Sequence, residues 1–142
     1  MKKLLLSFAL FASLLFSSIA MAAVYGPADA KFTVTPAAGW QESAMEGGVQ
    51  LTNGKSALVI QVTGNGGLTL EAFGDAVISQ AGLTDVKKNL DNDTLNIIGK
   101  KDGTELQMII SKGDEKHFAT FTMAGPDNDA MSEMIGSIKD AE

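Results

Sequence analysis

The chain has 142 residues, no cysteine, no arginine and a formal net charge of −6 at pH 7. An acidic chain without arginine lacks the basic surface that nucleic acids and anionic lipids require, and it lacks the side chain best shaped to grip a phosphate group. With no cysteine and one histidine, the composition also argues against thiol catalysis, disulfide bonds and typical zinc sites.

The N-terminus, residues 1–22, has the pattern of an export signal. Lys2 and Lys3 precede an apolar run over 4–16 that only serine interrupts. That run is shorter than the roughly 20 apolar residues needed to span a bilayer. Small residues then supply a signal-peptidase cleavage site, made of Ala20, Ala22 and Ala23. We therefore expect a cleaved Sec-type signal peptide, no membrane anchor afterwards, and a periplasmic mature domain over 23–142.

Three strand-like segments open the mature domain. Residues 31–35 alternate between polar and apolar side chains, and the segments 49–52 and 57–63 are rich in apolar and β-branched residues. Asn53-Gly54 separates the last two segments. This pair is typical of a two-residue type I′ hairpin turn, in which both residues have a positive φ.

A helix, four strands and a second helix complete the chain. Apolar residues at helical spacing predict the first helix, between an N-cap at Thr69 and a C-terminal glycine at Gly82. Short turns separate the four strand-like segments that follow, which are 86–90, 94–99, 104–111 and 116–124. The second helix opens at Asp127–Asp129 and carries an apolar stripe from Met131 to Ile138. Since tight turns join antiparallel strands and each helix must bury its stripe, we expect one α+β domain, a mainly antiparallel sheet of about six to seven strands packed with two amphipathic helices.

Three short motifs accompany this order of elements. They are "FTVTPAAGW" in the first strand and turn, "LTLEAF" at the start of the first helix and "MIGSIK" in the last helix. Together they resemble the PsbP/DcrB-like superfamily of small secreted α/β/α sandwich proteins, over nearly the whole mature chain. That superfamily includes photosystem II extrinsic proteins, bacterial periplasmic proteins, secretion-effector chaperones and a Ran-binding factor, and it has no shared catalytic motif. The resemblance implies an accessory domain that binds a partner, and it assigns no functional residues.

Two glycine-containing segments invite a nucleotide-binding interpretation, and neither has the required pattern. Gly54-Lys55-Ser56 looks like the end of a phosphate-binding loop, but five residues rather than four separate its glycine from Gly48, and a strand rather than a helix follows. Gly64–Gly67 does lie between a strand and a helix, but a threonine replaces the third glycine of a dinucleotide-binding loop. We interpret the first segment as a hairpin turn and the second as a flexible connection.

Two acidic clusters and the single histidine are further candidates for site chemistry. Asp91–Asp93 and Asp127–Asp129 carry oxygen ligands that suit calcium, but the fifth position of each cluster is apolar. We interpret them as a turn and a helix N-cap, and only convergence of separate loops on an ion stays open. His117 lies beside Lys116 at the start of a predicted strand, which favours an exposed residue over a catalytic base.

Trp40 and four methionines are interpreted as core residues. Trp40 is the only tryptophan, and we expect the turn before it to direct its indole into the core. The methionines occur at core periodicity, although thioether sulfur atoms could alternatively line an adaptable binding surface or hold copper. These methionines are Met108, Met123, Met131 and Met134.

Three functions are compatible with these patterns. The leading expectation is a non-catalytic periplasmic accessory domain that binds a partner protein or an envelope component without a cofactor. The second is a small-ligand or ion-binding module that uses the cleft where the Gly64–Gly67 loop meets the sheet. The third is a hydrolase that uses carboxylates alone, which requires two carboxyl groups to converge in one pocket. The sequence assigns no catalytic, cofactor-binding or metal-binding residue to any of them.

Overall fold

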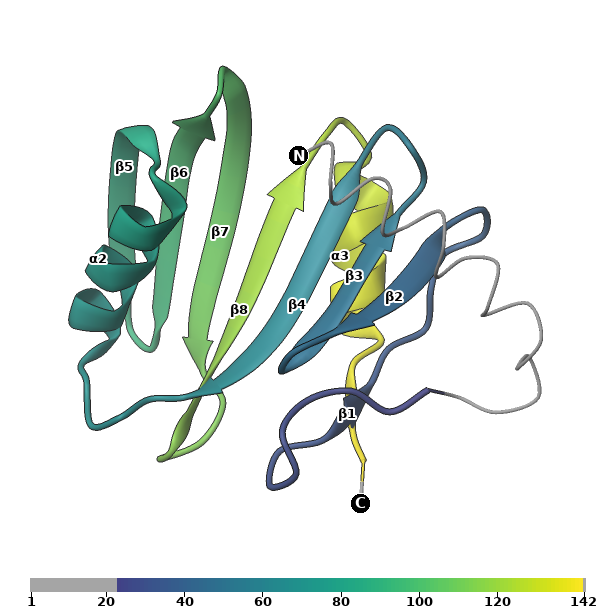
Figure 1. The fold of residues 1–142 in the computed structure, drawn as a ribbon, viewed down its shortest axis with the longest axis horizontal. Coiled ribbons are helices and arrows are strands. Elements are labelled where there is room, and N and C mark those ends of the chain that lie inside the picture. The colour runs from purple at the N-terminus through teal and green to yellow at the C-terminus, as the bar shows by residue number, and fades with distance from the viewer. Residues whose placement is uncertain (1–22, 142) are drawn as a thin grey trace.

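A seven-stranded antiparallel sheet forms the centre of the molecule (Figure 1), in a computed structural model that describes residues 23–141. Its strand order is β2-β3-β4-β8-β7-β6-β5. The strands are β2 (Gln41–Met45), β3 (Gly48–Thr52), β4 (Ala57–Gly64), β5 (Thr84–Asp91), β6 (Thr94–Lys101), β7 (Thr104–Lys112) and β8 (His117–Ala124). Two helices, α2 (Leu70–Ala81) and α3 (Asn128–Gly136), pack with this sheet. The predicted α+β fold with a mainly antiparallel sheet and two helices is therefore confirmed.

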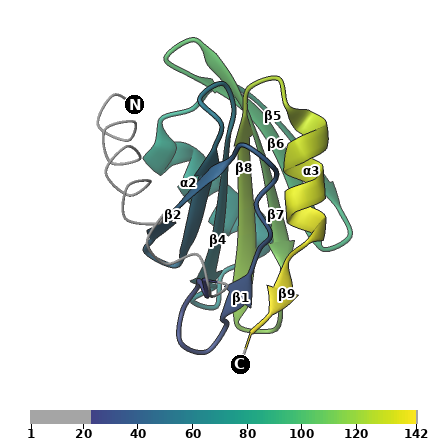
Figure 2. The same ribbon diagram turned by 90° about the vertical axis from the view of Figure 1, so that its right-hand side faces the viewer.

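A second, two-stranded sheet was not predicted. It pairs β1 (Phe32–Thr33) with β9 (Lys139–Asp140), so the beginning and the end of the described chain lie side by side (Figure 2). The pairing of these two strands depends on segments far apart in the sequence. The alternation over 31–35 indicates the strand β1 but not its partner, and β9 leaves no local signal in the sequence.

The two helices cover opposite faces of the main sheet (Figures 1 and 2). Alternate residues of a strand point to opposite faces, and in β7 Met108 and Ile110 pack on the α2 side whereas Ile109 packs on the α3 side. The buried α2-side core consists of Leu70, Leu95, Ile97, Met108, Ile110 and Phe118. The buried α3-side core consists of Tyr25, Phe32, Val34, Val49, Leu51, Leu58, Ile60, Met123, Met131 and Met134. The interpretation of the four methionines as core residues is confirmed, and they are divided between the two cores.

The ends of α2 follow the local sequence signals. The Thr69 side chain accepts a hydrogen bond from the backbone N–H of Ala72 at 3.1 Å, as an N-cap does. At the other end Gly82 has a left-handed conformation and its N–H returns to the carbonyl of Ile78. Both predicted caps are confirmed, and they fix where the chain enters and leaves this helix.

The first part of the mature domain differs from the prediction. The strand expected over 31–35 is limited to β1, which lies outside the main sheet. Its place at the sheet edge is taken by β2, which has no alternating apolar pattern in the sequence. Trp40 packs against the α3-side core but is only partly buried, so it borders that core rather than anchoring it.

The β3–β4 connection is a four-residue loop over 53–56, and the predicted two-residue type I′ turn at Asn53-Gly54 is wrong. Of this pair only Gly54 has a positive φ, of 92°. The reason is the Asn53 side chain, whose Oδ1 accepts hydrogen bonds from the backbone N–H groups of Lys55 and Ser56 at 2.9 and 2.7 Å. These bonds stabilise a wider turn than the dipeptide alone suggests.

The predicted signal segment, with Ala20 and Ala22 of its cleavage site, lies outside the described residues. Ala23, the expected first residue of the mature domain, packs against the α3-side core and is partly buried. Within residues 23–141 no helix has the length and apolar character needed to cross a membrane.

Candidate functional site

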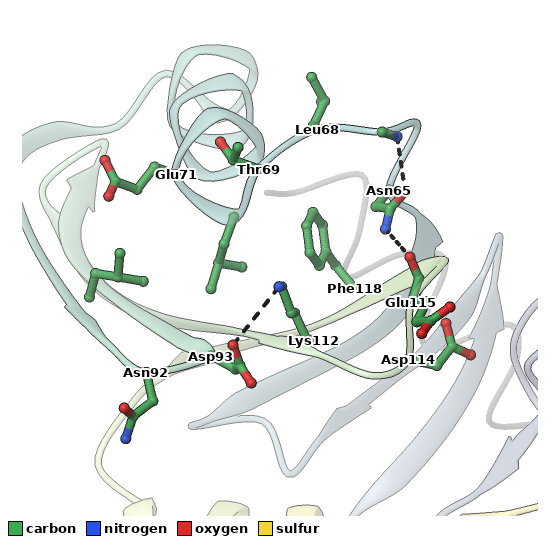
Figure 3. A pocket seen from close by; sticks show the side chains of 13 residues that line it. Asn65, Leu68, Thr69, Glu71, Asn92, Asp93, Lys112, Asp114, Glu115 and Phe118 are labelled. Carbon is green, nitrogen blue, oxygen red and sulfur yellow. Dashed lines mark hydrogen bonds and ion pairs between the residues drawn. The ribbon is translucent and has the colours of Figure 1, made fainter.

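A broad hollow of about 1060 Å³ lies at one end of the sheet, beside the first turn of α2 (Figure 3). Three connections surround it: the β4–α2 loop, the β5–β6 turn and the β7–β8 turn. They come together because alternate connections of an antiparallel meander lie at the same end of the sheet. This is the place where the sequence predicts the cleft of a small-ligand or ion-binding module, because the Gly64–Gly67 loop meets the sheet here.

The β4–α2 loop is held by Asn65. The Asn65 backbone N–H donates to the carbonyl of Lys116 at 2.7 Å, and its Nδ2 donates to the carbonyl of Glu115 at 2.8 Å. Its Oδ1 accepts a hydrogen bond from the N–H of Gly67 at 2.9 Å. The loop is therefore pinned to the β7–β8 turn, and its description as a flexible connection is wrong.

The β7–β8 turn is built around Asp114. One oxygen of its carboxylate accepts hydrogen bonds from the backbone N–H groups of Lys116 and His117, at 2.7 and 2.8 Å, and lies 2.9 Å from His117 Nδ1. The bond from Lys116, followed by the one from the His117 ring, holds the pKa of Asp114 below its usual value. Asp114 is thus kept charged, and it shapes the wall of the hollow.

His117 is buried, and its prediction as an exposed residue is wrong. Only 7% of its side chain is exposed, because it lies between two carboxylates, with Nδ1 facing Asp114 and Nε2 3.1 Å from Asp29 Oδ2. The hydrogen bond to Asp114, with a further contribution from Asp29, raises the pKa of His117. Asp29 belongs to the segment before β1, so His117 fastens the N-terminal segment to the β7–β8 turn. No local pattern in the sequence indicates a partner so far away.

The floor of the hollow is apolar and part of its rim is apolar as well. Phe118 and Leu70 belong to the α2-side core and are buried at its base. Leu68 and Leu90 also line it, and they are 48% and 44% exposed. Exposed large apolar side chains at the border of a concavity are typical of binding surfaces. In the sequence Leu68 comes just before the N-cap of α2, outside the helical spacing of the apolar stripe. That position is the one feature of the sequence that distinguishes Leu68 from the core residues of this helix.

The polar part of the rim is acidic. Four carboxylates line the hollow, those of Glu71, Asp93, Asp114 and Glu115, against one ammonium group, that of Lys112. Lys112 lies next to Asp93 in the hollow, with 3.9 Å between Nζ and Oδ1 (Figure 3). Both side chains are more than half exposed, and such a long surface pair contributes little stability.

Gly54-Lys55-Ser56 lies at the opposite end of the sheet and holds a carboxylate of the chain itself. Ser56 Oγ donates to Asp127 Oδ2 at 2.6 Å, Asn53 Nδ2 donates to the same oxygen at 3.1 Å, and the backbone N–H of Asp127 donates back to Ser56 Oγ at 3.1 Å. These bonds, Ser56 first, lower the pKa of Asp127. The Ser56 hydroxyl group, which a phosphate loop would use to hold a metal ion, is thus engaged by a carboxylate of the chain itself.

The acidic clusters do not combine into a metal site. The first is the β5–β6 turn, with Asn92 at a φ of 55° and Asp93 directed to Lys112. The second lies at the far end, where Asp127 is the N-cap residue of α3 as predicted, although its side chain makes no capping bond to the helix. Within residues 23–141 no three His, Cys, Asp or Glu side chains come close enough to share a metal ion.

No model of a known protein family matches the chain, and no curated protein matches it. What the hollow can bind is therefore inferred from the residues that line it.

Proposed function

We propose that the chain is a non-catalytic accessory domain, exported to the periplasm, that binds a partner protein through the hollow beside α2. In this proposal the two helices on opposite faces of the sheet make a PsbP/DcrB-like α/β/α sandwich, as the three sequence motifs suggest. The sandwich is a scaffold, and the connections at one end of its sheet form the binding surface.

The observation that carries the proposal is the exposure of Leu68 and Leu90 at the rim of one hollow. Together with Phe118 at the base, they give a concave surface with an apolar floor and a rim that is partly apolar and partly polar. Protein interfaces likewise combine apolar anchors with surrounding polar groups. Exposed leucines also carry a risk of aggregation, so their clustering around a concavity favours a binding role.

The state of the carboxylates supports binding rather than catalysis. A general acid in hydrolysis needs a carboxyl group whose pKa is raised, so that it keeps its proton. Asp114 has the opposite shift, because backbone N–H groups and His117 stabilise its charged form. Asp93 faces the ammonium group of Lys112. These two carboxylates therefore have structural and electrostatic roles at the rim.

The experiment compares two exposed apolar positions. A photo-crosslinking amino acid at Leu68 should capture one defined protein in cells, and the same amino acid at Ile98 should not. Ile98 is a matched control because it is 42% exposed and its side chain points to the other face of the sheet, paired with Gln107. The captured protein should bind the purified domain, and Leu68→Ser with Leu90→Ser should weaken that binding about tenfold or more. Equal capture from both positions would contradict the proposal.

A small ligand is the second candidate occupant, because the hollow is as large as the sites that hold small molecules, which reach roughly 1000 Å³. A ligand that raises the melting temperature of the wild type but not of Leu68→Ser, with no protein captured from position 68, would favour this alternative. Export is tested separately by N-terminal sequencing of the mature protein, which should begin at Ala23. A retained Met1 would contradict the predicted location.

A further inference from the structure

The charges around the hollow indicate which kind of partner segment fits it, and this inference rests on the proposed function. Four carboxylates face one ammonium group, so the rim has an excess of negative charge. The mature domain as a whole would add to this field, since removal of Lys2 and Lys3 leaves nine lysines against 17 acidic residues. A cation is therefore attracted to this end of the sheet both locally and at long range.

The N-terminus of α2 does not reverse this preference. A helix N-terminus favours anions when its backbone N–H groups are free. Here Thr69 Oγ1 accepts from the N–H of Ala72, and Asn65 Oδ1 accepts from the N–H of Gly67. Glu71 adds a negative charge in the first turn. An acidic ligand would thus meet the Glu71 carboxylate at this end of the helix, where the N–H of Ala72 is already engaged.

The one lysine in the hollow is easily replaced as an ion-pair partner. Lys112 Nζ lies 3.9 Å from Asp93, beyond hydrogen-bond distance, and both side chains are largely exposed. Little stability is lost when such a pair separates. An incoming ammonium or guanidinium group can therefore take the place of Lys112 beside Asp93 while Lys112 turns to solvent.

We propose that the partner segment is basic and amphipathic, with an apolar side chain that enters between Leu68 and Leu90 over Phe118 and flanking lysine or arginine side chains that face Glu71, Asp93 and Glu115. Apolar contact supplies the anchor, and the carboxylates select the sign of the flanking charges. Asp114 is left out of this set because its acceptor sites are engaged within the β7–β8 turn.

The test uses two capped hexapeptides, Lys-Lys-Leu-Leu-Lys-Lys and its twin with glutamate in place of each lysine, in calorimetric titrations of the mature domain. The lysine peptide should bind, more weakly at about 200 mM than at about 20 mM salt because ions screen exposed charges, and the glutamate twin should not. Leu68→Ser should weaken binding about tenfold, which separates anchoring in the hollow from attraction to an acidic surface.

A pair of matched double variants locates the charge effect. Glu71→Gln with Glu115→Gln removes two carboxylates from the rim and should weaken binding of the lysine peptide several-fold. Asp129→Asn with Glu133→Gln removes the same charge from α3, at the opposite end, and should change binding by less than about twofold. Equal losses in both variants, binding of the glutamate twin, or no binding of the lysine peptide would each overturn the inference. A partner captured from position 68 would still support the proposed function in each of those cases.

Discussion

The two ends of the sheet differ in their polar side chains, which are bonded to one another at one end and line an open hollow at the other. At the end formed by the β3–β4 loop and the start of α3, Asn53 and Ser56 are bonded to the carboxylate of Asp127, and the group is complete within the chain. At the other end the carboxylates of Glu71 and Glu115 line an open hollow beside exposed leucines. Each end contains a glycine-containing segment with the appearance of a ligand loop, and the Gly64–Gly67 segment is the one that borders the hollow beside α2.

The comparison shows that a short motif does not identify a binding site by itself, because its hydrogen-bonding groups can be used within the chain. Ser56 is buried and its hydroxyl group makes two bonds with Asp127, and the backbone N–H groups of Lys55 and Ser56 donate to Asn53 Oδ1, so none of these groups is free to bind a phosphate. Substitutions at this closed end should therefore change stability, whereas substitutions of the exposed rim at the open end should change binding.

The largest effect is expected from Gly125→Ala, at the closed end. Gly125 has a φ of 101°, and a Cβ there would collide with Ser56 Oγ and lie 2.6 Å from the carbonyl oxygen of Lys55. The backbone strain and the collision together should reduce the free energy of unfolding by about 2–4 kcal/mol. Urea denaturation measures this loss. Gly54→Ala is the matched control, because Gly54 also has a positive φ but a Cβ there meets no atom within 4 Å; an equal loss in both variants would contradict the collision.

Ser56→Ala should have the next largest effect. It removes the hydroxyl group that donates to the Asp127 carboxylate and accepts from the Asp127 N–H. The free energy of unfolding should fall by about 1–2 kcal/mol, the usual loss for a buried hydroxyl with such partners. A variant as stable as the wild type would show that solvent replaces these bonds without loss.

The same variant changes the dependence of stability on acid. Because the folded-state pKa of Asp127 is lowered, the carboxylate stabilises the fold fully above its unfolded pKa, near 4, and this contribution is lost as the pH falls through the lower folded value. In Ser56→Ala the pKa of Asp127 should rise toward the ordinary range. An NMR titration of the Asp127 carboxyl carbon checks the shift, and an unchanged pKa would mean that Ser56 is not its main cause.

His117 should give the fold a dependence on pH of the opposite sign. Its folded-state pKa is raised by Asp114 and, less strongly, by Asp29, so protonated His117 stabilises the fold below about pH 6.5 and this contribution is lost as the pH rises through the folded value. It is the only histidine in the chain, so one set of imidazole NMR signals reports its titration. The pKa should fall slightly in Asp29→Asn and further in Asp114→Asn, and the reverse order would contradict the geometry.

The smallest effect is expected from Lys55→Ala. Lys55 is exposed in the β3–β4 loop, so the free energy of unfolding should change by less than about 0.5 kcal/mol. A phosphate-binding loop would require this lysine. Calorimetric titration of the wild type with Mg-ATP should show no binding, and micromolar binding that disappears in Lys55→Ala would reopen the nucleotide interpretation.

The sequence predicts those features that depend on neighbouring residues. Helical spacing and caps placed α2 between Thr69 and Gly82, and apolar stripes identified residues of both cores. The same reasoning failed at Asn53. The dipeptide Asn53-Gly54 favours a two-residue turn, but in the wider loop that forms the Asn53 side chain reaches Asp127, which is 74 residues away in the sequence.

The site was less predictable because its parts come from separate connections. The Gly64–Gly67 loop suggested a cleft, but the carboxylates opposite it belong to the β5–β6 and β7–β8 turns. The burial of His117 depends on Asp29, which reaches it from a segment before β1. Residue type and local spacing contain no information on such long-range contacts. These contacts depend on how the meander and the N-terminal segment pack together.

The pairing of β1 with β9 determines when the domain can finish folding. The N–H of Ala141 donates to the carbonyl of Lys31, and Ser137 Oγ accepts from the N–H of Thr35. A chain that leaves the ribosome N-terminus first therefore carries Phe32 and Thr33 without their β9 partner until residues 139–141 have emerged as well. Until then Phe32 is paired only with nearby Tyr25, and such an uncovered apolar segment is open to binding by a chaperone that keeps chains unfolded.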